Sequence, residues 1–332
     1  MPCYCLYLLT LESDIPLPEL SSGEHTLPDL CFRLATGKEP VKENRQWFHS
    51  WTFPNGYKWL LFGRDGADFV LRFPYLAEFR VLDDGSTITC RVFGDTPRRT
   101  IRHLLLDQVL PLVLSHQVGG VLHGSAVALA NGALGFVGDS GQGKSTLTAA
   151  FSRLGVPVLT DDCLMLREGD DGTIGVLTGY PGMRLWSDVA EALCAQETGW
   201  SEVAHYTRKK RLRLDAGRMA SVDVPVPLAR IYFLETPREE PQEVVINRLS
   251  AREAFVELLK HTFRLDITNR DRLRSDFGWL GRIAALPIHY RLEIPWDLDL
   301  LPAICRQIRA SCEEGQESTH EMQRQSPQAI AR

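Results

Sequence analysis

A glycine-rich stretch, "GDSGQGKS" at residues 138 to 145, matches the phosphate-binding pattern G-x-x-x-x-G-K-[ST] at every fixed position. The apolar residues 133 to 137 before it predict a strand, and residues 144 to 154 predict a helix ended by Gly155. Glycines let consecutive backbone N–H groups turn toward phosphate oxygens, and the helix adds the positive end of its dipole. Because a chance glycine-rich turn has no need of this strand-loop-helix context, the stretch predicts a nucleotide site.

The residues of this loop have separate expected roles. Lys144 should reach the β- and γ-phosphates, and Ser145 should place its hydroxyl on Mg²⁺, so ATP and Mg²⁺ are the predicted cofactors. The chain has no N-K-x-D run for guanine recognition, which weakens a GTPase interpretation without settling the base. The predicted nucleotide-binding residues are Gly138, Asp139, Ser140, Gly141, Gln142, Gly143, Lys144, Ser145 and Thr146.

Two adjacent aspartates, Asp161 and Asp162, follow the short apolar stretch "VPVLT" at residues 156 to 160. If that stretch is a strand parallel to the one before the loop, both strands end at the same edge of the sheet. One carboxylate would then hold Mg²⁺, and the other would take the proton of an attacking hydroxyl. The alternative is a solvated turn, where aspartate is common. The position one helix after a phosphate loop favours the catalytic interpretation.

His123, in "VLHGSAVAL", is a third candidate catalytic residue. It precedes a strand that the hairpin turn at Asn131 and Gly132 connects to the loop strand. A lone histidine is more often structural than catalytic, so its position alone is a weak indication.

Taken together, "LHGSAVAL", "GFVGDSGQGKST" and "VLTDDCLML" resemble the HPr kinase/phosphorylase family. The resemblance implies a P-loop kinase that phosphorylates a protein serine with ATP and Mg²⁺, on a core related to phosphoenolpyruvate carboxykinase. It implies Asp161 as the base toward the serine and Asp162 as its metal or orienting partner beside Ser145. It also implies that Lys144 serves the phosphates and that His123 lies near the γ-phosphate.

Two departures from the family pattern bear on the acceptor. Thr146 stands where the bacterial regulators usually carry glutamate, and "GYPGMRLW" replaces their E-x-R-G-x-G segment. The chain is more similar to shorter relatives encoded beside ribosomally made peptides, including lasso peptides. A serine on a peptide or small protein, such as a lasso-type precursor, is therefore the favoured acceptor. The alternatives are HPr(Ser) kinase proper with its reverse phosphorylase activity, a small-metabolite kinase, and a non-catalytic nucleotide-binding module.

The chain divides by composition into three parts. Residues 1–95 hold short aromatic and β-branched runs between turn residues, which predicts a β-rich N-terminal domain with an antiparallel meander, a candidate for acceptor recognition. Residues 12 to 45 read as mostly loop. Residues 96–312 form the predicted P-loop kinase domain with a leading helix, and 313–332 a disordered tail. The predicted fold class is α/β, and the resemblance implies an HPr kinase C-terminal-like core.

Helix signals mark two segments of the kinase part. Pro97 suits the first helical position of an apolar helix that Asp95 or Thr96 would cap and Pro111 would kink. The run S-x-x-E at residues 250 to 253 predicts a capping box.

Composition narrows the function classes further. The 332 residues carry 37 basic and 42 acidic side chains, a net charge of −5, which gives no overall electrostatic case for nucleic acid. No apolar run reaches a membrane span of about 18 residues, and no basic segment precedes the apolar N-terminus, so a cytoplasmic protein is expected. The eight cysteines lack metal-ligand spacing and read as reduced thiols. The oligomeric state stays open, a homo-oligomer included.

Two basic features of the sequence each allow two interpretations of about equal weight. Arg184 is either a second phosphate contact or part of a structural ion pair. The run "RKKRLR" at residues 208 to 213 is either a solvated face or a clamp on phosphates or an acidic peptide.

Overall fold

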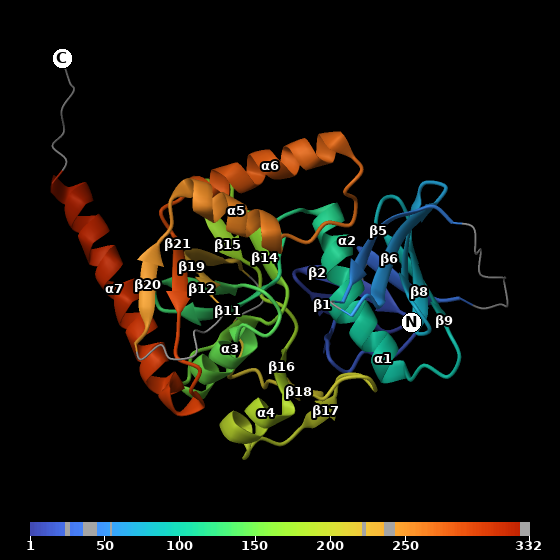
Figure 1. Ribbon diagram of the computed structural model, residues 1–332, viewed down its shortest axis with the longest axis horizontal. Coiled ribbons are helices and arrows are strands. Elements are labelled where there is room, and N and C mark those ends of the chain that lie inside the picture. Colours follow the sequence, from blue (N-terminus) through green and yellow to red (C-terminus); the bar gives the residue numbers. More distant parts are fainter. Residues whose placement is uncertain (24–26, 36–44, 54, 221–223, 236–242, 326–332) are drawn as a thin grey trace.

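The computed structural model describes residues 1–332 except 24–26, 36–44, 54, 221–223, 236–242 and 326–332; side chains are not described for 314–325. The described residues form a mixed α/β fold with an N-terminal sheet, a connecting helix, a central sheet with helices on both faces, and a small third sheet (Figure 1).

The N-terminal sheet has nine strands in the order β3-β1-β2-β4-β9-β8-β7-β6-β5. Consecutive strands from β5 to β9 pair antiparallel, which confirms the predicted meander. The turn glycines Gly66 and Gly85 have φ of 65° and 77°, a left-handed backbone that favours glycine. The strands are β1 (Cys3–Leu6), β2 (Leu9–Ser13), β3 (Ser21–Ser22), β4 (Leu30–Leu34), β5 (Trp47–Thr52), β6 (Lys58–Asp65), β7 (Asp68–Phe73), β8 (Ala77–Val81) and β9 (Thr87–Val92).

Residues 12 to 45 were expected to be mostly loop, and most of the described ones lie outside strands, but they include the strand β4. This strand runs parallel to both β2 and β9 and joins the first hairpin to the meander. Leu30 and Phe32 alternate into the core and are fully buried, so a short period-two pattern was hidden among polar neighbours. Residues 24–26 and 36–44 of this segment lie outside the described part.

The connecting helix consists of α1 (Arg98–Leu104), a π-helical turn η1 (Leu105–Val109) and α2 (Leu110–Gln117). Pro97 is the N-cap, with extended backbone, and neither Asp95 nor Thr96 caps the helix by its side chain. The irregularity lies before the predicted kink at Pro111. Because Pro111 has no N–H to bond the carbonyl of Asp107, that carbonyl instead accepts a hydrogen bond from Gln108 Nε2 at 3.0 Å.

The central sheet has the order β10-β14-β15-β19-β12-β11-β13, extended by β21 and β20. β12 and β13 are both antiparallel to β11, so they run parallel to each other with β11 between them, as the catalytic interpretation required. Both therefore end at the same edge of the sheet. The strands are β10 (Val121–Leu122), β11 (Gly124–Leu129), β12 (Gly132–Val137), β13 (Val158–Thr160), β14 (Leu164–Glu168), β15 (Ile174–Val176), β19 (Val226–Leu234), β20 (Val245–Arg248) and β21 (His289–Glu293).

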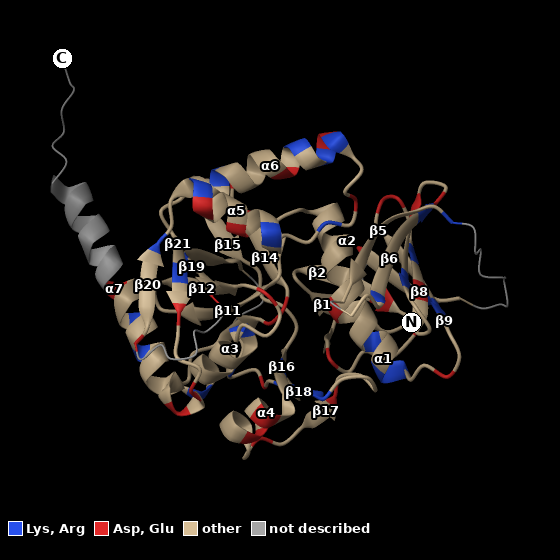
Figure 2. Cartoon of the chain, viewed as in Figure 1, with Lys and Arg blue, Asp and Glu red and all other residues tan. Residues whose placement is uncertain are grey.

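Helices cover both faces of the central sheet (Figure 1). Phe136 and Tyr232 share one hydrophobic cluster with α3 and α7, while the neighbouring Val137 and Phe233 share another with α5 and α6. The predicted capping box at Ser250 is present at the start of α5. Basic and acidic residues are interspersed along α6 (Figure 2). The helices are α3 (Lys144–Arg153), α5 (Ala251–His261), α6 (Arg270–Ala285) and α7 (Leu301–Gln325), with the short η2 (Leu298–Leu300) before α7.

A third sheet, in the order β16-β18-β17, lies beside α3 and carries α4. Its elements are β16 (Gly182–Trp186), α4 (Ser187–Cys194), β17 (Trp200–Glu202) and β18 (Lys209–Arg213). The basic run at 208 to 213 thus lies largely on the middle strand of a sheet.

The N-terminal sheet and the central sheet share one hydrophobic core. That cluster joins strand residues such as Phe32 and Phe79, the helix residues Leu105 and Leu112, and Met165 of β14. The connecting helix is therefore buried between the two sheets.

The C-terminal segment and the cysteines were also the subject of sequence predictions. The backbone of α7 continues as a helix to Gln325, into the segment expected to be disordered from 313, because its Glu, Gln and Met residues favour helix. Residues 326–332 lie outside the described part. No disulfide joins any of the eight cysteines, all of which are described. None of the helices in the described residues combines the length and the hydropathy that crossing a bilayer requires.

Acidic pH is expected to destabilise the fold through His289 on β21. Its ring is 1% exposed, and burial lowers its pKa to about 4. The unfolded chain therefore takes up a proton near pH 6.5 that the folded chain does not. The contribution of the neutral His289 ring to the free energy of unfolding is complete above that pH and falls by about 2 kcal/mol by pH 5. Urea unfolding at pH 7.5 and pH 5 measures it. His289→Asn should shrink the pH difference, and an unchanged difference in that variant would contradict the assignment.

Candidate active site

The phosphate loop lies between β12 and α3, and the nine residues predicted for nucleotide binding occupy this loop and the first turn of α3. Gly141 and Gly143 have φ of 93° and 88°, so the loop turns through left-handed conformations that glycine adopts without strain. Lys144 is 5% exposed, and its Nζ donates to the carbonyls of Gly138 at 2.7 Å and Asp139 at 2.8 Å. A buried cation thus lies inside the loop at the N-terminus of α3. Burial lowers the pKa of Lys144 to about 8.

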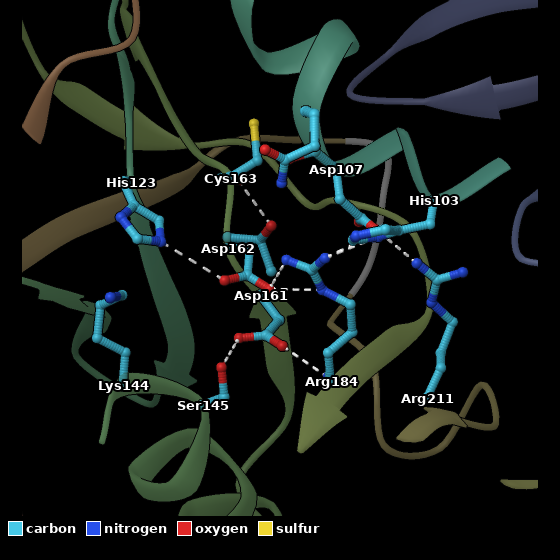
Figure 3. A network of polar contacts seen from close by, with 12 residues as sticks. His103, Asp107, His123, Lys144, Ser145, Asp161, Asp162, Cys163, Arg184 and Arg211 are labelled. Carbon is cyan, nitrogen blue, oxygen red and sulfur yellow. Dashed lines mark hydrogen bonds and ion pairs between the residues drawn. The ribbon is translucent and has the colours of Figure 1, made fainter. Parts of the chain in front are cut away.

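Asp161 follows β13 and bonds both Ser145 of α3 and Arg184 of β16 (Figure 3). Its Oδ1 accepts a hydrogen bond of 2.7 Å from Ser145 Oγ, and its Oδ2 accepts one of 2.8 Å from the backbone N–H of Arg184. Its side chain therefore lies against the first turn of α3. The structure brings together the loop serine and the first of the two predicted carboxylates.

Asp162 points in a different direction from Asp161. Its φ is +64°, in the left-handed region that a non-glycine residue rarely adopts, and this turn separates the two carboxylates. Arg184 Nε donates to Asp162 Oδ2 at 2.7 Å, while Asp162 Oδ1 lies 3.6 Å from His123 Nε2. Asp162 lines a cavity beside the phosphate loop. The two adjacent aspartates thus have separate surroundings.

Their electrostatics differ accordingly. Burial, together with the neighbouring charge of Asp162, raises the pKa of Asp161 to about 6. Burial would also raise the pKa of Asp162, but the charge of Arg184 and the nearby His123 ring hold it well below its ordinary value. Asp162 is therefore ionised at neutral pH.

His123 lies between β10 and β11, where the predicted strand begins. Its backbone N–H donates to the carbonyl of His261 at 2.7 Å, and its ring contacts Phe263 with centroids 6.0 Å apart. Burial lowers the pKa of its imidazole. The structure therefore places the third candidate beside Asp162, as a mostly neutral ring facing the same cavity.

A buried ion network that sequence reasoning missed supports the carboxylates (Figure 3). Asp107, on the π-helical turn η1, lies 2.9 Å from Arg184 Nη1 and 2.7 Å from His103 Nδ1, and it also accepts hydrogen bonds from Tyr180 and Arg211. The one sequence signal that could have identified Asp107 was the presence of a carboxylate inside the apolar run "HLLLDQVL". Asp107 holds Arg184, and Arg184 holds both site aspartates.

The structure shows the contacts of Arg184 and of the basic run at residues 208 to 213, for which the sequence left two interpretations each. Arg184 takes part in a buried structural ion pair with Asp107 and Asp162. In the basic run, Arg211 is buried against Asp107 and Glu19, while Lys209 lies 5.2 Å from the ring centroid of Trp186 and lines the cavity. The run is therefore divided between the network and the site.

The N-terminal hairpin also contacts the carboxylate turn. The Tyr7 hydroxyl donates to the carbonyl of Cys163 at 2.8 Å and lies 3.1 Å from Thr160 Oγ1. These atoms flank Asp161 and Asp162 on both sides. The first hairpin of the chain therefore helps to fix the turn that carries both carboxylates.

The cavity at the site has a volume of about 510 Å³ and is lined by residues from both halves of the molecule. A larger cavity of about 760 Å³, between the first hairpin and α6, includes neither the phosphate loop nor the carboxylates. The smaller cavity is therefore the candidate active-site cavity. Its lining includes Trp51, His103, Asp107, His123, Asp139, Ser140, Asp162, Arg184, Trp186, Tyr206, Lys209, His261 and Phe263.

Comparison with solved structures yielded 81 matching chains. The chain is similar to the HPr(Ser) kinase/phosphatase from Coxiella burnetii, with 12% sequence identity and a TM-score of 0.33, over 61% of this chain and 97% of that one. No family model and no curated protein matches the chain. The roles of individual residues are therefore argued from the geometry of this chain.

Proposed function

We propose that the protein is a kinase that transfers the γ-phosphoryl group of ATP to a serine hydroxyl of a peptide or small protein, with Mg²⁺ as cofactor. The observation that carries the proposal is that the two adjacent aspartates make different contacts. Asp161 bonds the phosphate-loop serine at 2.7 Å, while Asp162, ionised, faces the cavity next to His123. A site that only binds nucleotide does not need the second carboxylate.

The residues present fit ATP and Mg²⁺. The N-terminal N–H groups of α3 and the buried ammonium of Lys144 offer a cradle for phosphates. Ser145 and Asp161, already in contact, are oxygen ligands of the hard type that Mg²⁺ prefers, usually one or two protein groups plus phosphate oxygens. When bound there, the metal would neutralise charge on the phosphates. Among the described residues no three His, Cys, Asp or Glu side chains form a ready-made metal cluster.

We assign Asp162, rather than Asp161, the role of base. Asp162 would orient the serine hydroxyl and accept its proton as the bond from the serine oxygen to phosphorus forms and the bond to the leaving ADP oxygen breaks. The proton then passes to solvent. This exchanges the roles that the family resemblance implied, with Asp161 in place of Asp162 as the metal ligand beside Ser145. The support is that Asp162 lines the cavity, whereas Asp161, which bonds Ser145 and the backbone of Arg184, is not among the lining residues.

The remaining groups hold this geometry. Lys144 would lie against the phosphates, and the neutral ring of His123 would limit the movement of Asp162 on the cavity side. Arg184 keeps Asp162 charged and in place. The acceptor is proposed to be a peptide or small protein because Trp51 of the N-terminal sheet lines the same cavity.

Incubation with γ-labelled ATP, Mg²⁺ and serine-containing peptides is expected to yield labelled phosphoserine. Lys144→Met should lower ATP affinity and transfer together, because it removes the buried cation of the loop. Lys260→Met is a matched control, since that lysine lines the cavity but pairs with Glu257 at 2.8 Å and is 57% exposed. ATP binding without transfer to any peptide would contradict the proposal, and label on a free metabolite would indicate a small-molecule kinase.

A further inference from the structure

We propose that a row of touching aromatic side chains, most of them exposed, docks the acceptor by binding an apolar segment next to its serine. The row consists of Phe53, Tyr57, Trp59 and Tyr206, and it is called the aromatic row below. This inference rests on the proposed kinase function and adds to it the chemical character of the acceptor.

The aromatic row is continuous. The rings of Phe53 and Tyr57 stack with centroids 6.2 Å apart, Phe53 and Trp59 are 5.9 Å apart, and Trp59 meets Tyr206 edge-on at 5.1 Å. Phe53 and Tyr57 belong to the connection of β5 and β6, and Tyr206 to that of β17 and β18. The row therefore joins the N-terminal sheet to the kinase part.

Three of the four rings are exposed, and Trp59 between them is partly buried against the core. Phe53 is 48% exposed, Tyr57 42% and Tyr206 39%. Single exposed aromatics are normal, but rings that touch one another and remain exposed form an apolar patch of the kind that marks interaction sites. Aromatic side chains are also common anchors at interfaces, because they offer large area at little cost in conformational entropy.

The row ends at the catalytic cavity. Tyr206 lines that cavity, and its ring lies 5.9 Å from His103, which bonds Asp107 at 2.7 Å. An acceptor held on Phe53 and Tyr57 would thus have its neighbouring residues directed toward Asp162.

The sheet geometry favours an extended peptide as the occupant. β5 is the last strand of the N-terminal sheet in the described residues, and its sequence, "WFHSWT", has no Asp, Glu, Lys, Arg or Pro to protect an edge. Trp51 of this strand lines the catalytic cavity. An extended backbone can lie along such an edge while its apolar side chains contact the row.

A library of synthetic peptides of fixed length, each with one serine, tests the inference. The wild type should prefer apolar or aromatic residues at a fixed distance from the serine. For the best peptide, the double variant Phe53→Ala with Tyr57→Ala should raise KM about tenfold or more, since anchor residues dominate interfaces, with kcat and ATP affinity unchanged. Tyr75→Ala is the matched control, because Tyr75 is 82% exposed on the turn between β7 and β8 of the same sheet.

The contact itself can be checked by photo-crosslinking. With p-benzoylphenylalanine in place of Phe53, the labelled peptide should crosslink, and with the same group in place of Tyr75 it should not. If peptides are phosphorylated without an apolar preference, or with the same KM in the double variant, the docking inference is overturned and the kinase function stands. If no peptide is phosphorylated, both fail.

Discussion

Asp162→Asn is expected to lower the rate of phosphoryl transfer by about a hundred to ten thousand times, while ATP still binds. Asparagine has nearly the shape of aspartate, so the left-handed turn should persist, because asparagine tolerates that conformation. What is lost is the ability to accept the serine proton. Steady-state transfer at saturating ATP, Mg²⁺ and peptide, combined with calorimetric ATP binding, measures the two effects separately.

Asp161→Asn provides the counterpart. If Asp161 is the metal ligand beside Ser145, its variant should require more Mg²⁺ for half-maximal rate and recover part of the loss when Mg²⁺ is raised. The Asp162 variant should show no such recovery. Asp171→Asn is the control, since Asp171 lies on a solvated turn. The opposite pattern, with recovery in the Asp162 variant alone, would restore the original assignment of Asp161 as base.

Arg184→Met is expected to lower the free energy of unfolding by about 3–5 kcal/mol, because removing one member of a buried ion pair leaves uncompensated charge. Arg184 is 7% exposed and lies 2.9 Å from Asp107, and its guanidinium also bonds Asp162. Methionine keeps much of the packing volume of the side chain. Urea unfolding at neutral pH measures the change.

A solvated ion pair offers the comparison. Arg282→Met removes a contact of 3.0 Å with Glu168; the side chains of Arg282 and Glu168 are 61% and 37% exposed. This variant should lower the free energy of unfolding by less than about 1 kcal/mol. Equal losses in the two variants would mean that the network around Asp107 behaves as surface charge, and that Arg184 does not hold the site in the way proposed.

The features predicted well from sequence are those that short segments determine. The phosphate loop depends on glycines within eight residues and on the strand and helix that flank it. The capping box at Ser250 and the meander of β5 to β9 likewise need only neighbours in the chain. The parallel direction of β12 and β13, on which the catalytic interpretation of the aspartates depended, is present in the structure.

The remainder depends on contacts between distant segments. Nothing local to Asp107 indicates that Arg184 and Arg211 will meet it, since 77 and 104 residues separate them in the chain. The separate directions of Asp161 and Asp162 follow from a single positive φ, which the sequence does not reveal. The aromatic row likewise joins Trp59 to Tyr206 across two sheets.

The bond from Tyr7 to the carboxylate turn has a consequence for the order of folding. The phosphate loop and α3 can form from adjacent residues, but the Tyr7 hydroxyl meets its partners across 153 and 156 residues of chain. Contacts of such long range form only after the intervening chain has been ordered, at a large cost in loop entropy. We therefore expect the carboxylate turn to reach its final form only once the N-terminal sheet has docked, after the glycine-rich loop and α3 have formed.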